Sequence, residues 1–204
     1  MKGSRYTLTF ALVAGSLSAL LLTGVGLATR PLREANARAE EVRNVLAVMG
    51  AEYPEGASAD ELLELFEGLA RTEERAGRTV YVYDPADRPG RVVVPFRGSG
   101  LWGPIRGFLA LSPDLETVKA VSFFEQQETP GLGGEIASEG FRRRFEDRSA
   151  RGPDGRPGLA ITAPGAATGP NEIDGISGAT MTCDKVENML NETLRGILSG
   201  GEER

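Results

Sequence analysis

The chain carries near its end the stretch Asp174-Gly175-Ile176-Ser177-Gly178-Ala179-Thr180, which leads directly into an apolar helical pattern. Apolar residues recur at helical spacing from Val186 to Ile197, and this predicts a helix that starts near Cys183 and stops at Ser199-Gly200-Gly201. The N-terminus of a helix presents unpaired N–H groups and a partial positive charge, so it favours a bound phosphate group. The hydroxyl of Thr180, which follows three small residues, is well placed to hold one.

The same stretch also suits an ordinary cap of the last helix, because Ser and Thr side chains readily accept a hydrogen bond from the first helical turn. Thr182 or Ser177 would then be the capping residue. This role does not exclude phosphate binding. Ser177, Gly178 and Ala179 have almost no side-chain bulk, which leaves room for a modifying enzyme and then for a cofactor.

Four β-rich runs lie upstream of this stretch and are separated by Gly, Pro and Asp. The runs cover residues 79–83, 91–96, 105–111 and 117–124. Short strands joined by turn residues are typical of an antiparallel sheet, and we predict one here.

Helices are expected around this sheet. Ser58-Ala59-Asp60-Glu61 has the form of a capping box, and the apolar spacing after it predicts a helix over residues 59–71. A short helix is expected over residues 138–147, and the Gly- and Pro-rich loop 151–170 has room for a brief strand at 159–162. The fold class that follows is α+β: one domain with an antiparallel sheet and flanking helices.

The N-terminal region has no charged residue from Tyr6 to Ala28. A helix of this length crosses a bilayer core of about 30 Å, so we predict a transmembrane helix over residues 6–28. A cleaved signal peptide is the alternative, but its apolar core normally runs only about 7–15 residues. No clean A-x-A cleavage site precedes Arg30-Pro31, which favours a retained span.

The segments on either side of this span define the expected organisation. Residues 1–5 form a cytoplasmic N-terminus, and Lys2 and Arg5 favour an orientation with the N-terminus inside. Residues 29–75 form a helical membrane-proximal segment, in which a charged helix over 33–48 lifts the domain off the membrane. Residues 76–204 then form the main domain, on the periplasmic side of the inner membrane.

Composition excludes several kinds of function. The chain has a net charge of −6 and no stripe of Lys and Arg interleaved with aromatics, so nucleic acid is not an expected partner. Histidine is absent, which removes His-based catalytic triads, His proton shuttles and nearly every zinc site. Cys183 is the only cysteine and is expected to be a tolerated small residue rather than a redox centre. We therefore predict no catalytic side chain and no metal, and a cofactor that carries the chemistry.

Two glycine-rich segments remain. Gly98-Ser99-Gly100-Leu101-Trp102-Gly103 has the form G-x-G-x-x-G, but Pro104 starts another strand-like run where a dinucleotide fold needs a helix, so we predict a hairpin connection. Glu128-Thr129-Pro130-Gly131-Leu132-Gly133-Gly134 suits a plain Pro-Gly turn, and it equally suits a backbone that approaches a flat ring. The residues alone leave both interpretations of the second segment open.

Three segments in this order resemble one known family. They are Gly100-Leu101-Trp102-Gly103-Pro104, the run from Glu128 to Ile136, and the run from Asp174 to Thr182. Together they resemble the FMN-binding domain of the C subunit of the sodium-translocating NADH:quinone reductase. The G subunit of the Rnf electron-transport complex shares the last two. The Gly-Leu-Trp segment and the lead-in at residues 123–127 are more similar to the NADH:quinone reductase subunit.

The resemblance implies a covalent cofactor. In that family a flavin transferase splits FAD and leaves FMN joined by a phosphoester to the last Thr of the motif, which is Thr180 here. It also implies a set of residues near the flavin ring or in the attachment motif: Leu101, Trp102, Glu128, Thr129, Leu132, Gly133, Asp174, Ser177, Gly178 and Ala179.

The function implied by the resemblance is that of an electron-transfer subunit in a membrane-bound respiratory complex. One span cannot enclose a sodium pathway, and no nucleotide fold is visible for NADH, so other subunits must supply both. The chain is then part of an oxidoreductase but is not catalytic alone. Two alternatives stay open: the G subunit of an Rnf-type complex, and a membrane-anchored flavin module that acts as a sensor or scaffold.

Overall fold

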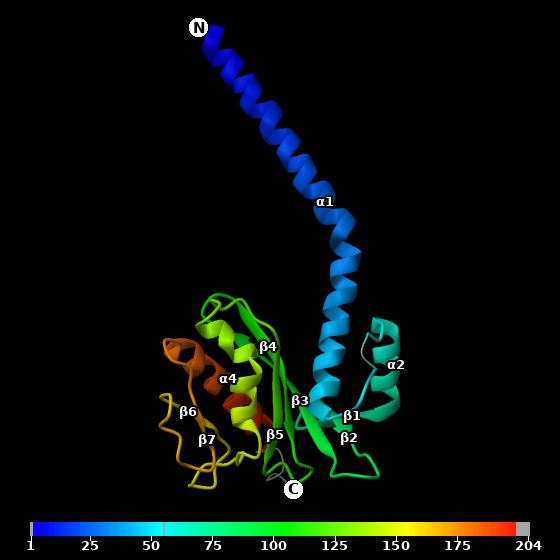
Figure 1. The fold of residues 1–204 in the computed structure, drawn as a ribbon, viewed down its shortest axis with the longest axis vertical. Helices are drawn as coiled ribbons and strands as arrows, with labels where there is room; N and C mark the ends of the chain where they lie inside the picture. Colours follow the sequence, from blue (N-terminus) through cyan, green and yellow to red (C-terminus); the bar gives the residue numbers. More distant parts are fainter. Residues whose placement is uncertain (1, 55, 199–204) are drawn as a thin grey trace.

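Short turns join consecutive β-rich runs, so each strand pairs with the next one along the chain. The computed structural model, which describes residues 2–54 and 56–198, has a five-stranded antiparallel sheet in the order β1-β2-β3-β4-β5 (Figure 1). Its strands are β1 (Ala70–Arg75), β2 (Arg78–Tyr83), β3 (Arg91–Ser99), β4 (Pro104–Leu111) and β5 (Val118–Glu125). The α+β fold class and its antiparallel sheet are confirmed, and each of the four predicted runs forms a strand.

The first strand was not predicted. The helix expected over residues 59–71 is α2 (Ala59–Leu69), and it ends two residues early because Ala70 is already extended and pairs with Tyr83. The sequence of β1 is almost entirely polar, since it forms the edge of the sheet and buries no side chain. The segment boundary that we predicted at residues 75 and 76 falls in the turn between β1 and β2.

Helices cover both faces of the sheet because successive side chains of a strand point to opposite faces. Val92 and Val94 of β3 lie in one apolar cluster with α4 (Thr180–Leu198), whereas Val93 lies in another with α1 (Lys2–Met49) and α2. Figure 1 shows α4 and the two N-terminal helices on opposite sides of the strands. The domain is therefore three layers deep, with a buried apolar layer on each face of the sheet.

The helix α1 runs from the N-terminal end into the core of the domain. It contains Pro31, and the ribbon bends in its middle part, as expected where a proline interrupts helical hydrogen bonding (Figure 1). The region predicted to lift the domain off the membrane is indeed helical, but its second half is buried: Leu46 is fully enclosed and Met49 nearly so. In the described part of the chain α1 is the one helix that is long and apolar enough to cross a membrane, by length and composition alone.

The remaining elements lead to the stretch from Asp174 to Thr180. The helix expected over residues 138–147 is a short α3 (Glu139–Arg142) followed by a 3-10 turn η2 (Arg143–Phe145), and another 3-10 turn, η1 (Gly133–Ala137), precedes it. The expected brief strand is β6 (Ala160–Thr162), which pairs in parallel with the unpredicted β7 (Glu172–Asp174). The stretch from Asp174 to Thr180 is thus a connection between a strand and α4. The expected helix end at residues 199–201 lies outside the described residues.

The contact of α1 with the sheet yields a stability prediction. Leu46→Ala removes a fully buried side chain, so we expect the free energy of unfolding to fall by about 2–5 kcal/mol. Urea unfolding of the detergent-solubilised chain, followed by circular dichroism, measures this loss. Leu32→Ala, at a position of α1 that is 68% exposed, is the control. Equal losses in the two variants would contradict the packing of α1 in the core.

Candidate cofactor site

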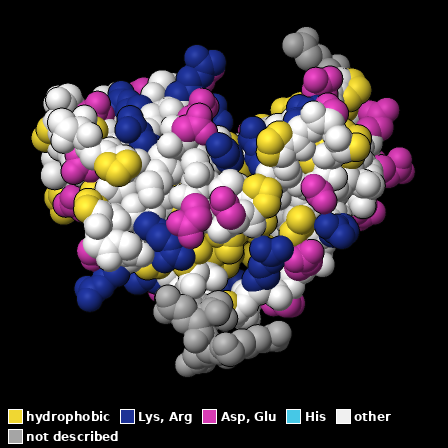
Figure 2. Space-filling model, turned by 90° about the horizontal axis from the view of Figure 1, so that it is seen from below, with side chains coloured by type: hydrophobic (Ala, Val, Ile, Leu, Met, Phe, Trp, Pro, Cys, Tyr) yellow, Lys and Arg dark blue, Asp and Glu magenta, His cyan; other side chains and the backbone are white. Residues whose placement is uncertain are grey.

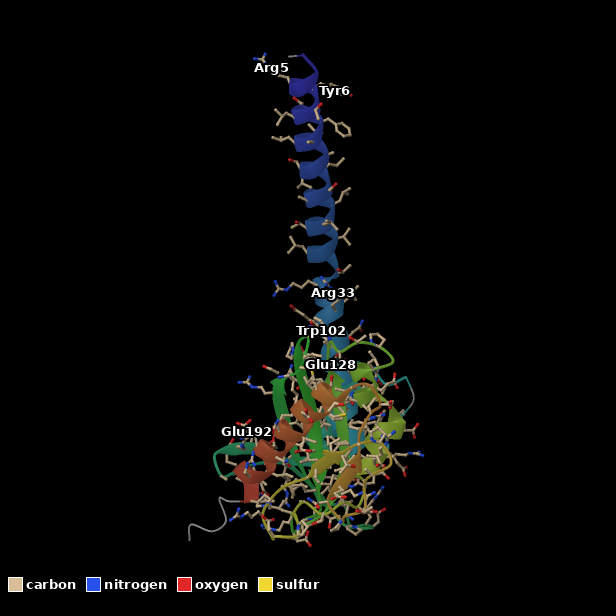
Figure 3. All side chains as sticks on the ribbon, turned by 90° about the vertical axis from the view of Figure 1, so that its left-hand side faces the viewer. Arg5, Tyr6, Arg33, Trp102, Glu128 and Glu192 are labelled. Atoms are coloured by element: carbon tan, nitrogen blue, oxygen red, sulfur yellow. The ribbon has the colours of Figure 1, made fainter. Side chains whose placement is uncertain are left out.

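Three separate parts of the chain meet around one hollow at the end of the domain. They are the β3–β4 hairpin tip at residues 100–103, the loop after β5, and the N-terminus of α4. The hollow has a volume of about 370 Å³ and is lined by Leu101, Trp102, Glu128, Thr129, Leu132, Gly133, Gly178, Ala179, Thr180, Met181 and Thr182. Figure 3 shows Trp102 and Glu128 at the end of the domain that is nearest to Arg33 of α1.

The hairpin tip supplies the outer wall of the hollow. Ser99 pairs with Pro104, and the Gly100 N–H donates to the Gly103 carbonyl at 2.7 Å, so the G-x-G-x-x-G segment is a tight hairpin connection, as predicted. The tip holds two apolar side chains toward solvent: Leu101 is 39% exposed and Trp102 is 68% exposed. Such exposed apolar side chains beside a hollow offer a surface for a flat apolar ligand.

Glu128 lies at the centre of the site and is only 5% exposed. Its Oε1 atom accepts hydrogen bonds from the backbone N–H groups of Leu101 at 2.8 Å and Trp102 at 3.1 Å. Its Oε2 atom accepts a hydrogen bond from the Thr182 hydroxyl at 2.7 Å. One buried carboxylate therefore joins the hairpin tip, the loop after β5 and the first turn of α4.

Glycine is required where backbone passes close to this carboxylate. A Cβ atom on Gly133 would stand 2.5 Å from the Thr182 hydroxyl oxygen and 2.9 Å from Oε2 of Glu128. A Cβ atom on Gly100 would collide with Oε1 of the same carboxylate. Gly178 has a φ of +75°, which an L-amino acid rarely adopts, and this turn directs the chain into α4.

Thr180 is the first residue of α4, and it is exposed on the wall of the hollow. The first turn of α4 contains no acidic residue, and the described hydrogen bonds give its leading N–H groups no side-chain acceptor. Thr182 is not the cap of this helix, because it is already the third helical residue, and its hydroxyl donates to Glu128. Unpaired N–H groups and the helix dipole thus favour an anion beside the Thr180 hydroxyl.

Two residues of the motif lie behind the site rather than in it. Asp174 and Ser177 line a neighbouring hollow of about 470 Å³ that also contains Arg144. The Asp174 carboxylate accepts a hydrogen bond from the Ala167 N–H at 3.0 Å, and this bond is the main reason why the pKa of Asp174 is lowered. Arg144 donates to the carbonyl oxygens of Asp174 and Gly175, each at 2.8 Å. Asp174 and Arg144 therefore fix the shape of the loop that leads to Thr180.

Comparison with known proteins agrees with this geometry. Residues 100–195, which contain all three parts of the site, match the FMN-binding domain family. The match covers somewhat less than half of the chain and shows that this part is similar to an FMN-binding domain. The resemblance to the C subunit that we inferred from the motifs is also confirmed by the relatives.

The relatives are C subunits of Na(+)-translocating NADH-quinone reductases. The chain is 35% identical to that of Vibrio alginolyticus over 61% of this chain and 50% of the relative, so it spans about half the length of several curated relatives. It is 27% identical to that of Pseudomonas aeruginosa over 91% of this chain and 89% of the relative. The crystal structure of the C subunit from Parabacteroides distasonis has the same fold, with a TM-score of 0.71. The two chains are 24% identical, and the match covers 86% of this chain and 98% of the Parabacteroides chain.

The sequence predicted most residues that line the hollow but did not reveal Met181 as a lining residue or the hydrogen bond of Thr182. Met181 follows Thr180 directly and is 61% exposed, which is unusual for a large apolar side chain. Thr182 stands inside an apolar helical face, and a polar side chain in such a place generally has a buried partner. These two features were the signals in the sequence for Met181 and Thr182. The role of Arg144 had no such signal, because its partners are backbone carbonyls.

The only cysteine of the chain is buried and contacts the motif. Cys183 is buried, and its sulfur accepts a hydrogen bond from the Ile176 N–H at 3.4 Å. Burial is the main cause that raises the pKa of the Cys183 thiol. A thiol with a raised pKa is poorly reactive, so the structure agrees with the interpretation of Cys183 as a small packing residue.

This burial predicts slow alkylation. At pH 8 we expect iodoacetamide to modify Cys183 far more slowly in the folded chain than in the chain unfolded by urea, because both the raised pKa and the burial of the sulfur oppose attack. The rate for the folded chain should begin to rise at a higher pH than the rate for the unfolded chain. Intact mass spectrometry measures both rates, since there is one thiol to modify. Equal rates would show that the thiol is accessible.

Proposed function

We propose that this chain carries FMN joined by a phosphoester to the hydroxyl of Thr180, and that it serves as the electron-transfer subunit of a Na+-translocating NADH:quinone reductase-type complex. The observation that carries this proposal is the position of Thr180: an exposed hydroxyl on the first residue of α4, at the wall of the hollow. The motif resemblance supports the same attachment residue, and the relatives support a subunit of this type.

The residues present fit such a cofactor. A hollow of about 370 Å³ lies within the range of about 300–1,000 Å³ that is typical of small-molecule sites. Leu101, Trp102 and Leu132 would offer apolar surface to the flavin ring system, and all three are exposed at the hollow. The phosphate would lie against the N–H groups of α4, where helix geometry stabilises its charge.

The attachment step uses the hydroxyl of this chain, FAD as the donor, and an enzyme that acts on both. The Thr180 oxygen forms a bond to the FMN phosphorus of FAD while the pyrophosphate bond breaks, so AMP leaves and the hydroxyl proton is released. We propose a flavin transferase as the partner that performs this step. The exposed position of Thr180 leaves its hydroxyl accessible to such an enzyme.

Bound FMN supplies electron transfer in single steps, and the chain then needs no catalytic acid or base. A covalent link keeps the local cofactor concentration high whatever the affinity of the hollow. The site can therefore stay open on one side for electron exchange with other subunits. This agrees with a chain that has no histidine and whose one buried carboxylate at the site is engaged in hydrogen bonds.

We further propose that α1 anchors the chain in the inner membrane and that the domain lies on the periplasmic side. The hollow lies at the end of the domain from which α1 leaves, so the flavin would face membrane-embedded partner subunits (Figure 3). On the opposite end, acidic and basic side chains are interspersed over the surface, which suits contact with solvent (Figure 2). The sodium pathway and the NADH site would belong to those partners.

The attachment proposal predicts the effect of one hydroxyl. Thr180→Ala, coexpressed with a flavin transferase, should fold but lose all flavin fluorescence that survives denaturing electrophoresis. Mass spectrometry of the peptide that contains Thr180 should show the added FMN phosphate ester in the parent chain and not in the variant. Thr72→Ala on β1, an exposed threonine far from the site in the sheet, is the matched control. Covalent flavin that persists in Thr180→Ala would refute the assignment.

The topology proposal has its own test. A C-terminal alkaline phosphatase fusion should be active in intact bacterial cells, because that enzyme matures only outside the cytoplasm, and a C-terminal green fluorescent protein fusion should fluoresce weakly. The reverse pattern would place the domain in the cytoplasm. Deletion of residues 2–30 should move the chain from the membrane fraction to the soluble fraction, and retention in the membrane would contradict α1 as the anchor.

A further inference from the structure

We propose that Glu128 is a positioning residue that clamps the β3–β4 hairpin tip to the first turn of α4, and so fixes the shape of the FMN site without contacting the flavin itself. The family resemblance implied that Glu128 lies near the ring, and its side chain does line the hollow. The residue, however, is only 5% exposed, and both oxygens of its carboxylate accept hydrogen bonds from the protein. The clamp is a property of this chain and does not require a bound cofactor, whereas its effect on the flavin rests on the proposed function.

The Glu128 carboxylate is hydrogen-bonded to two other parts of the chain. Oε1 accepts two backbone N–H groups, from Leu101 and Trp102, and Oε2 accepts the hydroxyl of Thr182. These donors come from segments that are 26 to 54 residues away from Glu128 in the chain. Hydrogen bonds to a charged group are stronger than those between neutral groups, and a buried carboxylate that loses a donor is strongly destabilised. The three segments are thus held to each other through one side chain.

Two glycines enclose the Glu128 carboxylate. Gly100 and Gly133 approach the carboxylate from the hairpin side and from its own loop, and neither position has space for a Cβ atom. The backbone has therefore closed around the carboxylate until only glycine fits. A side chain that merely formed one wall of a ligand site would not need this enclosure on both sides. The enclosure indicates that the carboxylate is part of the framework of the site.

The hairpin tip shows why a clamp is needed. Within the tip the Gly100–Gly103 hydrogen bond is the one backbone bond that closes the loop among the described residues, and a glycine stands at each end of it. Leu101 and Trp102 between them are exposed and have little packing to hold them. Their N–H groups are held by Glu128, so the clamp determines where the apolar wall of the hollow stands relative to Thr180.

The test uses Trp102 as the reporter, because it is the only tryptophan in the chain. In the flavin-free full chain in detergent, Glu128→Ala should add fast local motion to the fluorescence anisotropy decay of Trp102. Glu128→Gln should preserve the slow decay, since its amide oxygen can accept both N–H groups and its amide N–H can donate to Thr182. Thr182→Val should loosen the tip partially, and Thr182→Ser should not. Glu135→Ala, an exposed carboxylate on η1, is the control.

The flavin-loaded chain gives a second readout. If the clamp sets the position of Trp102 against the ring, flavin emission per bound FMN should rise in Glu128→Ala and stay at the parent level in Glu128→Gln. Unchanged Trp102 motion in both Glu128→Ala and Thr182→Val, or equal loosening in Glu128→Gln and Glu128→Ala, would overturn the proposal. If Glu128→Ala does not fold by circular dichroism, the Thr182 pair decides in its place. A parent chain without bound flavin would refute the proposed function, and the flavin-free measurement would still test the clamp.

Discussion

The alternation of side chains along β3 and β4 is the constraint on which the rest of this structure depends. Because Val93 and Phe108 face one way and Val92, Val94 and Leu109 the other, the sheet must be covered on both faces. The chain uses its N-terminal helix for one face and its C-terminal helix for the other. The anchor candidate and the helix that carries Thr180 are thereby fixed to the same sheet, and the orientation of the site relative to the anchor follows from the fold.

The same strands also determine where the site can form. β3 and β4 pair from Val92–Leu111 to Ser99–Pro104, so their hairpin extends to the end of the domain where α4 begins. A hollow between a hairpin tip and a helix N-terminus has backbone N–H groups on two sides. Glu128 accepts hydrogen bonds from the N–H groups of the hairpin tip. The N–H groups at the start of α4 have no side-chain acceptor among the described contacts. One side of the hollow is thus consolidated by the protein, and the other is left for an external anion.

The sequence predicted the parts of this fold whose signals are local. Strands that bury alternate side chains, the capping box of α2 and the apolar face of α4 all follow from spacing along the chain. β1 and β7 could not be found this way, since β1 is a polar edge strand and β7 has three residues that pair only with the distant β6. The sequence also did not reveal that the residues of the motif line two separate hollows. The motif places Asp174 and Ser177 beside Thr180 in sequence, yet the turn at Gly178 sends them to a different hollow.

Few side chains that line the hollow carry a group suited to chemistry. The cysteine is buried with a raised pKa, histidine is absent, and the Glu128 carboxylate that lines the hollow is engaged by three donors. Among the other side chains that line the hollow, the free hydroxyls of Thr129 and Thr180 are the candidates for a nucleophile. Among the described contacts no base is hydrogen-bonded to either hydroxyl, so neither is activated. Such a site is suited to hold a reactive group that is supplied from outside, as the proposed function requires. Its exposed apolar rim and its single accessible helix N-terminus are suited to that task.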